Sequence, residues 1–438
     1  MQTNEQPSVG RQLPPPIAGT RFDRFRGEVM AGGAVTERDP VEEPFGGGSS
    51  GAVAGLAILG LFVWLGFTSG WMLLFVVGIL VSVFLHELGH FVTARLTGMK
   101  ATQFFIGFGP RLWSFHRGET EYGVRLLPLG AFVRIIGMNN LDDVPPADEA
   151  RTYRQKSYPR RMLVITAGSL MHLLIAIVLL FGVFAIRGQI VDRVGAEVGD
   201  VAADSGADVA GLRQGDIVVS VGGVPVEDGD LGAAVRQAEP GDTVAVMFER
   251  DGQQLTVDAT LGENATPGEL NGTALLGVTS RGATEWEELS VGEAATTTFT
   301  DLLPATWEST KGIVQVLNPI NIIDHLTGES EDLRTRPTTI VGVTGVSDDI
   351  GELQGLAGVL YLLAILNVFV GVFNMFPLLP LDGGHAAIAT YERVREIGRG
   401  GRRYFADVAR LMPFTMGVIA VLFFLFMSGL YLDITKPL

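Results

Sequence analysis

The chain has 438 residues, of which 47% are hydrophobic, and its mean hydropathy is +0.32. This balance predicts several membrane-spanning helices together with a polar domain. The net charge of −16 argues against nucleic acid as a partner. Because the chain has no cysteine, a disulfide framework, a thiolate nucleophile and a cysteine zinc site are excluded. Any zinc ion must be held by histidine and carboxylate side chains.

The first fifty residues are polar and rich in proline and glycine, without the short apolar core of a signal peptide. We interpret residues 1–50 as a disordered cytoplasmic tail. Five later stretches are apolar enough to cross a bilayer, which takes about 20 residues. They cover 52–67, 71–95, 162–186, 356–376 and 412–432. The first is short and close to the second, so it either forms a tight hairpin with it or only dips into the membrane.

Charge predicts how these stretches are oriented. Eleven basic residues lie between 95 and 161, and six arginines lie between 393 and 410. Residues 191–354 instead hold roughly thirty acidic residues against eight basic ones. Because loops rich in lysine and arginine stay in the cytoplasm, we expect the two basic loops inside and the acidic region outside. Five spans then put the N-terminus inside and the C-terminus outside.

The acidic region begins with a small β-rich domain, which we expect over residues 188–285. Its strand-like runs cover 216–221, 243–248 and 254–257, with a helix at about 231–238. A linker follows over 286–354, and its part from Gly312 to Ile323 suits the membrane surface. On the cytoplasmic side, residues 102–136 also have the pattern of strands and turns. We expect a hairpin there that dips toward the bilayer, where other parts of the protein must cover its backbone.

The sequence His86-Glu87-Leu88-Gly89-His90 lies near the end of the second apolar stretch. Side chains four residues apart project from the same face of a helix, so His86 and His90 can reach one zinc ion. Glu87 then lies beside the open position of the metal, where it can take a proton from water. The alternative is a pair of surface histidines on a soluble helix. Ionisable residues in an apolar spanning helix are costly, however, and this indicates function.

A catalytic zinc ion takes three protein ligands, so one is still missing. The candidate is Asp382, at the cytoplasmic end of the fourth apolar stretch, and this depth agrees with that of His86 and His90. An Asp-Gly turn that only caps a helix is the alternative interpretation. His385 is a rival ligand, although a neighbouring hydrogen-bonding role suits it better.

Together these motifs resemble the site-2 proteases of the bacterial RseP type. The resemblance rests on the spanning His-Glu-x-x-His helix, the turn Gly107–Pro110, the polar insert and the late run from Asn374 to Gly384. It covers residues 71–435, and residues 97–138 are most similar to the actinobacterial members. It implies that His86, His90 and Asp382 bind Zn²⁺ and that Glu87 is the general base. Asn374 corresponds to a family residue that holds the substrate backbone or the oxyanion.

The resemblance also implies a fold and a location. We expect a polytopic helical protein of a bacterial plasma membrane with four or five transmembrane helices. The two halves of its membrane core are residues 51–187 and 355–438. A cytoplasmic, membrane-associated β-hairpin region and an extracytoplasmic PDZ domain complete it, and the active site lies near the cytoplasmic side.

By the same resemblance, the substrate is a single-pass membrane protein such as an anti-sigma factor. An upstream site-1 protease trims it outside, and this chain makes the second cut of regulated intramembrane proteolysis. A helix cannot be cut while its carbonyls are paired, so the substrate must unwind. The region of Gly130, Ala131 and Phe132 can then pair with the unwound segment as an added strand.

Residues 210–223 resemble the Ala-Gly-Leu-x-x-Gly-Asp turn and strand of a PDZ domain. Such a domain can bind an extended peptide, here along an edge near residues 275–278. Alternatively it only excludes substrates with large outer domains, and we favour this gating role.

The chain departs from the family pattern in two places. The extra first span and the long tail are one departure, and because neither carries a chemical motif we assign them no catalytic role. The other is a single position. The family usually has Gly-Pro-x-x-Asn at the start of the span after the β region, whereas this chain has Gly168-Ser169-Leu170-Met171-His172. His172 therefore occupies the asparagine position, where it can hydrogen-bond to an oxyanion or to a bound peptide. A histidine that only packs between helices is the alternative.

Two functions of other classes compete with the protease. A peptide-binding membrane scaffold would have a degenerate metal site, but His86, Glu87, His90 and Asp382 are all present. A metal transporter would have repeated polar residues in its spans or inverted repeats, and the sequence has neither.

Overall fold

The computed structural model describes residues 49–138, 142, 144–265, 270–330 and 332–437. Nearly all of the predicted tail, residues 1–50, therefore lies outside the described residues. The chain forms two compact units, Val183–Thr297 and the rest. We name them the β unit and the membrane unit. All predicted site residues lie in the membrane unit.

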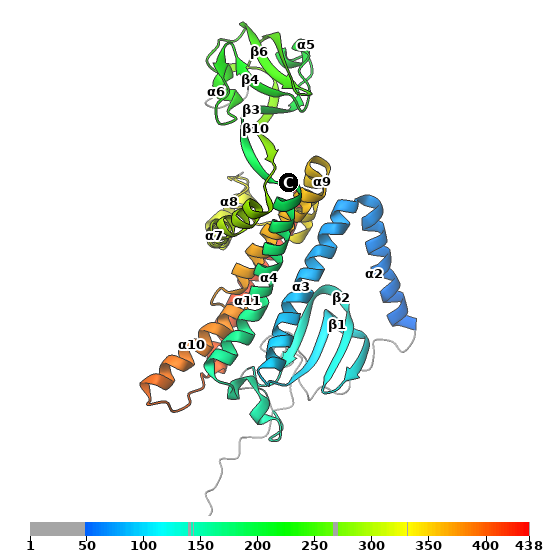
Figure 1. The fold of residues 1–438 in the computed structure, drawn as a ribbon, viewed down its shortest axis with the longest axis vertical. Helices are drawn as coiled ribbons and strands as arrows, with labels where there is room; N and C mark the ends of the chain where they lie inside the picture. The colour runs from blue at the N-terminus through cyan, green and yellow to red at the C-terminus, as the bar shows by residue number, and fades with distance from the viewer. Residues whose placement is uncertain (1–48, 139–141, 143, 266–269, 331, 438) are drawn as a thin grey trace, which may run out of the picture. The chain divides into compact units, whose positions relative to one another are not determined.

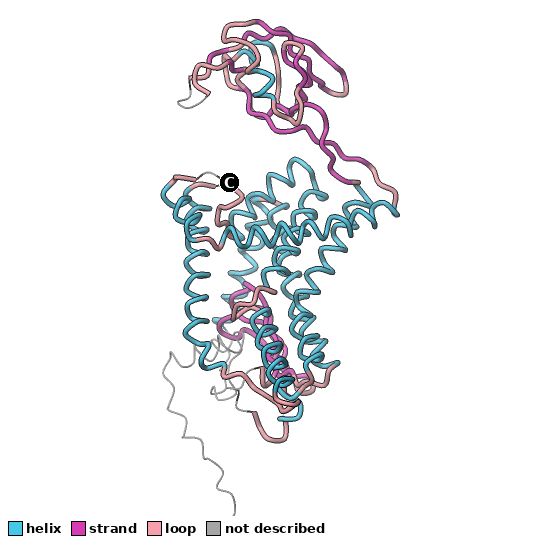
Figure 2. Tube along the Cα trace, turned by 90° about the vertical axis from the view of Figure 1, so that its left-hand side faces the viewer, coloured by secondary structure: helices cyan, strands magenta, loops and turns pink. Residues whose placement is uncertain are grey.

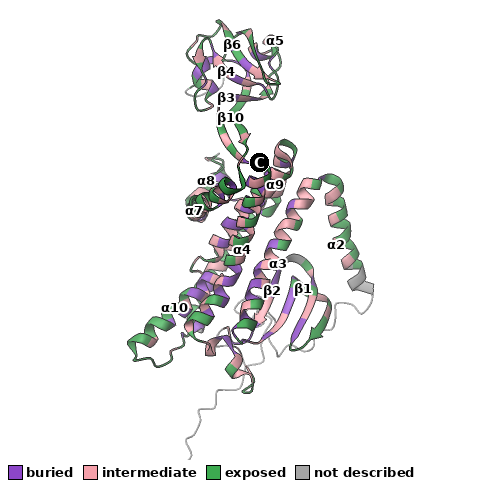
Figure 3. Ribbon diagram, viewed as in Figure 1, coloured by how far each residue is buried: buried purple, intermediate pink, exposed green. Residues whose placement is uncertain are grey.

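Within the described residues, four helices are long and apolar enough to cross a bilayer. They are α3 (Gly70–Leu96), α4 (Tyr158–Arg187), α9 (Ile340–Asn374) and α11 (Met412–Thr435). A fifth helix, α2 (Ser49–Thr68), forms the predicted tight hairpin with α3 (Figure 1). Its apolar part is shorter than the four spans, and its surface is largely exposed (Figure 3). The predicted stretch 52–67 is thus the only one of the five that is not a full-length spanning candidate.

The segment predicted as a linker, 286–354, is mostly helical. It contains α7 (Val291–Val316), α8 (Pro319–Thr327) and the first part of α9. The backbone of α9 leaves helical geometry at Gly355, where φ is 65° and ψ is −152°. The predicted span from 356 therefore matches only the part of α9 that follows this break. The part of α9 before Gly355 contains polar residues, so the hydropathy of the sequence does not predict this part of the helix.

Strands β1 (Ala101–Arg117) and β2 (Thr120–Ile135) form the predicted hairpin, but both strands bend. The first part of β1 pairs on one side with residues 131–135 and on the other with 121–124. Residues 120–125 pair in turn with 111–117. The hairpin is therefore a curled sheet whose two edges are residues 131–135 and 111–117. In the tube view, these strands occupy one part of an otherwise helical unit (Figure 2).

The β unit contains a six-stranded sheet in the order β10-β3-β4-β6-β7, with β5 (Val224–Pro225) paired to β4. Its main strands are β3 (Gln189–Val201), β4 (Ile217–Val221), β6 (Thr243–Arg250), β7 (Gln253–Thr260) and β10 (Val278–Glu287). The three predicted strand runs are confirmed as β4, β6 and β7, and the predicted helix as α6 (Leu231–Val235). A short helix, α5 (Gly206–Ala210), and a small pair, β8 (Gly262–Glu263) with β9 (Ala274–Leu275), also belong to the unit.

One apolar core of the membrane unit holds the elements around the predicted site. It joins Phe91 of α3, Phe104 of β1 and Val164 of α4 to Ala389 of α10 (Asp382–Gly398), all of them buried. The long helices carry buried faces toward one another and exposed faces outward (Figure 3). That pattern suits helices whose outer face meets lipid.

Candidate zinc site

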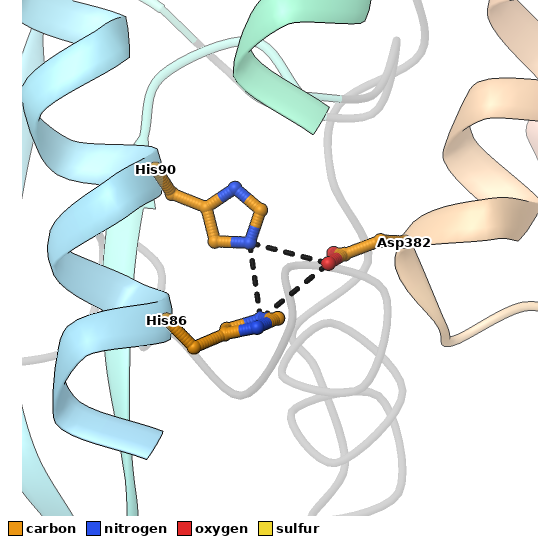
Figure 4. A group of neighbouring side chains, drawn as sticks. All are labelled: His86, His90 and Asp382. Atoms are coloured by element: carbon orange, nitrogen blue, oxygen red, sulfur yellow. Dashed lines mark hydrogen bonds and ion pairs between the residues drawn. The ribbon is translucent and has the colours of Figure 1, made fainter. Parts of the chain in front are cut away.

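Three predicted ligands meet in the membrane unit, although almost 300 residues separate the first from the last (Figure 4). His86 Nε2 and His90 Nε2 are 3.1 Å apart. Asp382 Oδ2 lies 3.4 Å from the first of these nitrogens and 3.2 Å from the second. Both imidazoles are buried. Three potential ligand atoms this close to one another could hold one metal ion.

The donor set fits zinc. Zinc bonds of 2.0–2.1 Å in tetrahedral geometry put ligand atoms roughly 3.3 Å apart, which agrees with the three separations. Two imidazoles and one carboxylate are also a donor set that catalytic zinc sites use, and it leaves the fourth position open. Asp382 Oδ2 is buried without a hydrogen-bond donor. A bound cation would provide this oxygen with a partner.

Helix α4 orients the second histidine. Val164 O lies 2.7 Å from His90 Nδ1, so Nδ1 carries the proton and donates it to the carbonyl oxygen. Nε2 is then unprotonated and available to a metal ion. This neighbour of the site was not predicted, because no sequence pattern identifies a backbone carbonyl on another helix.

Two glycines let α3 and α4 approach each other at the site. A Cβ atom on Gly89 would lie 2.8 Å from Ala167 O. A Cβ atom on Gly168 would lie 2.4 Å from both His86 Cε1 and His90 Nε2. The imidazoles therefore pack directly on the bare backbone of α4.

Asp382 is the first residue of α10, not the end of the preceding span. Helix α9 ends at Asn374, and a turn leads from it to α10. The sequence-based placement of Asp382 at the end of the fourth stretch therefore needs correction. Asp382 nevertheless lies close to both histidines, because the turn brings the start of α10 back toward α3.

Glu87 lies beside the three donors. Its Oε1 is 3.9 Å from His86 Nε2, and its Oε2 accepts a hydrogen bond of 3.0 Å from the N–H of Val133. Val133 belongs to the edge segment 131–135, so this N–H points away from the rest of the sheet. A cavity of about 100 Å³ is lined by Glu87, His90, Val133, Asp382 and other residues of the site. It gives water room beside the carboxylate.

His172 is buried, and its ring centre lies 4.9 Å from that of His86. Its Nδ1 is 2.8 Å from Asn367 Oδ1, and the amide nitrogen of Asn367 donates to Leu363 O at 2.8 Å. The amide oxygen must therefore accept, and His172 Nδ1 donates. In neutral His172, Nε2 can then only accept a hydrogen bond. Asn367 was not predicted, although an amide within an apolar run is a signal that could have found it.

The remaining predicted residues are placed as follows. His385 lines the cavity with Asp382 but is not part of the three-residue group. Phe132 lines the same cavity, and Gly130 and Ala131 precede it in β2, both buried. Asn374 ends α9, just before the turn that leads to Asp382. The roles of these residues stay predictions.

Comparison with known proteins identifies the family of this chain. The family model described as peptidase family M50 matches residues 74–429. Zinc metalloprotease Rip1 of Mycolicibacterium smegmatis is 33% identical over 399 residues, covering 84% of this chain and 98% of that protein. Zinc metalloprotease RasP of Shouchella clausii is 27% identical over 401 residues, covering 74% and 90%.

A solved PDZ domain, from the SdrC-like protein of Listeria monocytogenes, aligns with 20% of this chain and 90% of its own, at 22% identity. Its TM-score of 0.18 is too low to establish a shared fold. The family match, by contrast, spans most of the chain and includes all three donors. The chain belongs to peptidase family M50, the site-2 proteases, and is an intramembrane zinc metalloendopeptidase.

Proposed function

We propose that this protease hydrolyses peptide bonds in the spanning segments of single-pass membrane proteins, with His86, His90 and Asp382 as the zinc ligands. The convergence of these three donors beside Glu87 supports the proposal. When bound, zinc polarises the scissile carbonyl and activates water. Purified protein should therefore contain zinc and cleave a spanning-helix substrate. Zinc with no cleavage of any tested helix would favour the scaffold function.

Glu87 is the proposed general base. It takes the proton of the attacking water and later delivers it to the leaving amide nitrogen. The N–H of Val133 holds one carboxylate oxygen, which leaves the other directed toward the ligands. The proposed mechanism thus uses the edge of the β sheet to orient the base.

The same edge is the proposed docking site for the substrate. An unwound segment that pairs along residues 131–135, where Glu87 already accepts the N–H of Val133, would run past Glu87 and the zinc ligands, in keeping with the predicted substrate-binding role of Gly130, Ala131 and Phe132. Pairing as a strand satisfies backbone groups that cannot stay unpaired in a membrane. The scissile bond would then lie beside residues 131–135.

Because the chain has no cysteine, single cysteines can test this edge without background. In a Glu87→Gln protein, Val133→Cys should form a disulfide with a cysteine near the cleavage site of the substrate, because paired strands hold Cβ atoms about 5 Å apart. Trp113→Cys is the control, since Trp113 is exposed and lies on the opposite edge. Equal cross-linking at both edges would exclude the proposed docking site.

His172 is proposed to accept a hydrogen bond from a peptide N–H of the bound substrate. This differs from donation to an oxyanion, because Asn367 engages the donor nitrogen. We expect His172→Ala to lower turnover up to about tenfold, as loss of one hydrogen bond does, while zinc content stays near that of the wild type. Metal analysis and kinetics on the same preparation measure both. Full activity of the variant would leave His172 with a packing role only.

The β unit is proposed to be an extracytoplasmic PDZ domain that excludes substrates with large outer domains. Its two ends meet, since Gln189 of β3 pairs with Glu287 of β10. Removing residues 189–287 and joining the flanking chain should therefore disturb little else. We expect the shortened protein to cleave a substrate with a bulky outer domain at least about tenfold faster than the full chain does. If the full chain and the shortened chain reject it equally, the gate lies elsewhere.

The biological role is proposed from the family. The substrate is an anti-sigma-like protein that a site-1 protease has already trimmed, and this chain makes the second cut. The basic loops support a site near the cytoplasmic face and an outer β unit. Exposed apolar side chains on α7, namely Phe299, Leu303 and Trp307, support contact of this helix with the membrane surface.

A further inference from the structure

A buried ion pair joins the two helices behind the zinc site. Arg161 Nη1 donates to Glu392 Oε2 at 2.5 Å, and each side chain is only 5% exposed. Arg161 lies in the first turn of α4, and Glu392 lies three turns along α10. Neither residue has a role in the mechanism proposed above.

The pair also ties down the surrounding chain. Glu392 Oε1 accepts a hydrogen bond of 2.8 Å from the N–H of Ala406, in the segment before α11. The Arg161 guanidinium lies over the ring of Tyr153, 5.7 Å from its centre. Both oxygens of the carboxylate are therefore engaged, and each partner of the ion pair has one further contact that holds it in place.

Each helix of the pair carries part of the zinc site. One turn along α4 from Arg161, Val164 O orients His90. At the other helix, α10 begins with Asp382. Ala386 and Ala389 of α10 belong to the apolar core that also contains Val164 and Ile165 of α4. Two side-chain contacts with a defined direction also join these helices: an exposed hydrogen bond of 3.2 Å between Tyr158 Oη and Thr390 Oγ1, and the ion pair, which is buried.

We propose that Arg161 and Glu392 are positioning residues that set the register of α10 on α4 and so the distance between Asp382 and His90. The inference rests on the proposed ligand roles of those two residues. A functional site must hold its groups within about 0.5 Å of the productive geometry. A pair that fixes one helix against the other meets this requirement.

Stability alone is a poor reason for such a pair. Taking two charges out of water costs nearly as much as their attraction returns, and apolar residues of similar volume are often as stable or more so. Apolar residues, however, would not hold the two helices in one defined relative position. Replacing both Arg161 and Glu392 should therefore separate a role in stability from a role in positioning, because it removes the directional contact without leaving a lone buried charge.

The test uses full-length protein in lipid nanodiscs and measures two quantities. The zinc Kd is obtained by competition with a fluorescent chelator, and the Tm is measured on metal-free protein. We expect the double variant R161M/E392M to keep the wild-type metal-free Tm and to raise the zinc Kd about tenfold or more, as loss of supporting contacts around a metal does. The control R151M/E119M removes a partly exposed pair of the same unit and should leave the zinc Kd unchanged.

Asp382→Asn in the same titration distinguishes the two proposals. If it loses zinc while R161M/E392M binds zinc as tightly as the wild type, the positioning role is wrong and the ligand assignment stands. If it binds zinc normally, the ligand assignment itself fails. A metal-free Tm that falls together with zinc affinity would mean a general structural role. If this double variant does not fold, R161M/E392Q decides, because it leaves no buried charge and the glutamine oxygen can still accept the N–H of Ala406: a raised Kd supports the proposal, and a wild-type Kd overturns it.

Discussion

Glu87→Gln should abolish measurable proteolysis while the protein keeps its zinc. The loss expected for a missing general base is about 10²–10⁴-fold in kcat. Glutamine has nearly the same shape as glutamate, and its amide oxygen can still accept the N–H of Val133. It cannot take a proton from water. Because His86, His90 and Asp382 are untouched, zinc content and folding should match those of the wild type.

Kinetics with a spanning-helix substrate and metal analysis of the same sample check this result. Glu293→Gln is a suitable control, since Glu293 also accepts a backbone N–H, from Ser290 at 2.9 Å, but is exposed on α7. It should retain wild-type activity. Substantial turnover by Glu87→Gln would remove Glu87 from the mechanism and would require another base beside the zinc site.

The donors that share a local pattern were predictable from the sequence. His86 and His90 are one helical turn apart in an apolar helix, and that spacing alone places both imidazoles on one face. Asp382 needed a second argument, the number of ligands that zinc takes, together with the family resemblance. Its position at the start of α10 was missed because the turn after Asn374 has no hydropathy signal.

Contacts between distant segments were not predictable in the same way. The carbonyl of Val164, the N–H of Val133 and the amide of Asn367 each reach the site from another element. Backbone groups are the same in every residue, so the sequence does not show which of them contact the site. The carbonyl of Val164 and the N–H of Val133 do so only because α4 and β2 pack on α3. The curl of the β hairpin has the same origin, since alternation predicts strands but not which edges they leave free.

Gly168→Ala should damage the site by adding a single methyl group. The new Cβ atom would lie 2.4 Å from both His86 Cε1 and His90 Nε2, far inside ordinary contact. Neither imidazole can retreat freely, because Val164 O holds His90 and Asp382 approaches from the other side. A displacement of about 1 Å at a reacting centre can cost about 10²-fold. We therefore expect kcat/KM to fall about 100-fold and zinc binding to weaken.

Gly182→Ala provides the matched control, because Gly182 lies on the same helix and has nothing within 4 Å of the added atom. Both substitutions replace glycine by the best helix former, which by itself favours the helix by about 1 kcal/mol. The control should therefore be as active as the wild type and at least as stable. Its comparison with Gly168→Ala isolates the contact with the imidazoles from any effect on α4. If both variants keep full activity, the two histidines do not pack on α4 as described, and the geometry that joins His86, His90 and Asp382 would have to be different in the membrane.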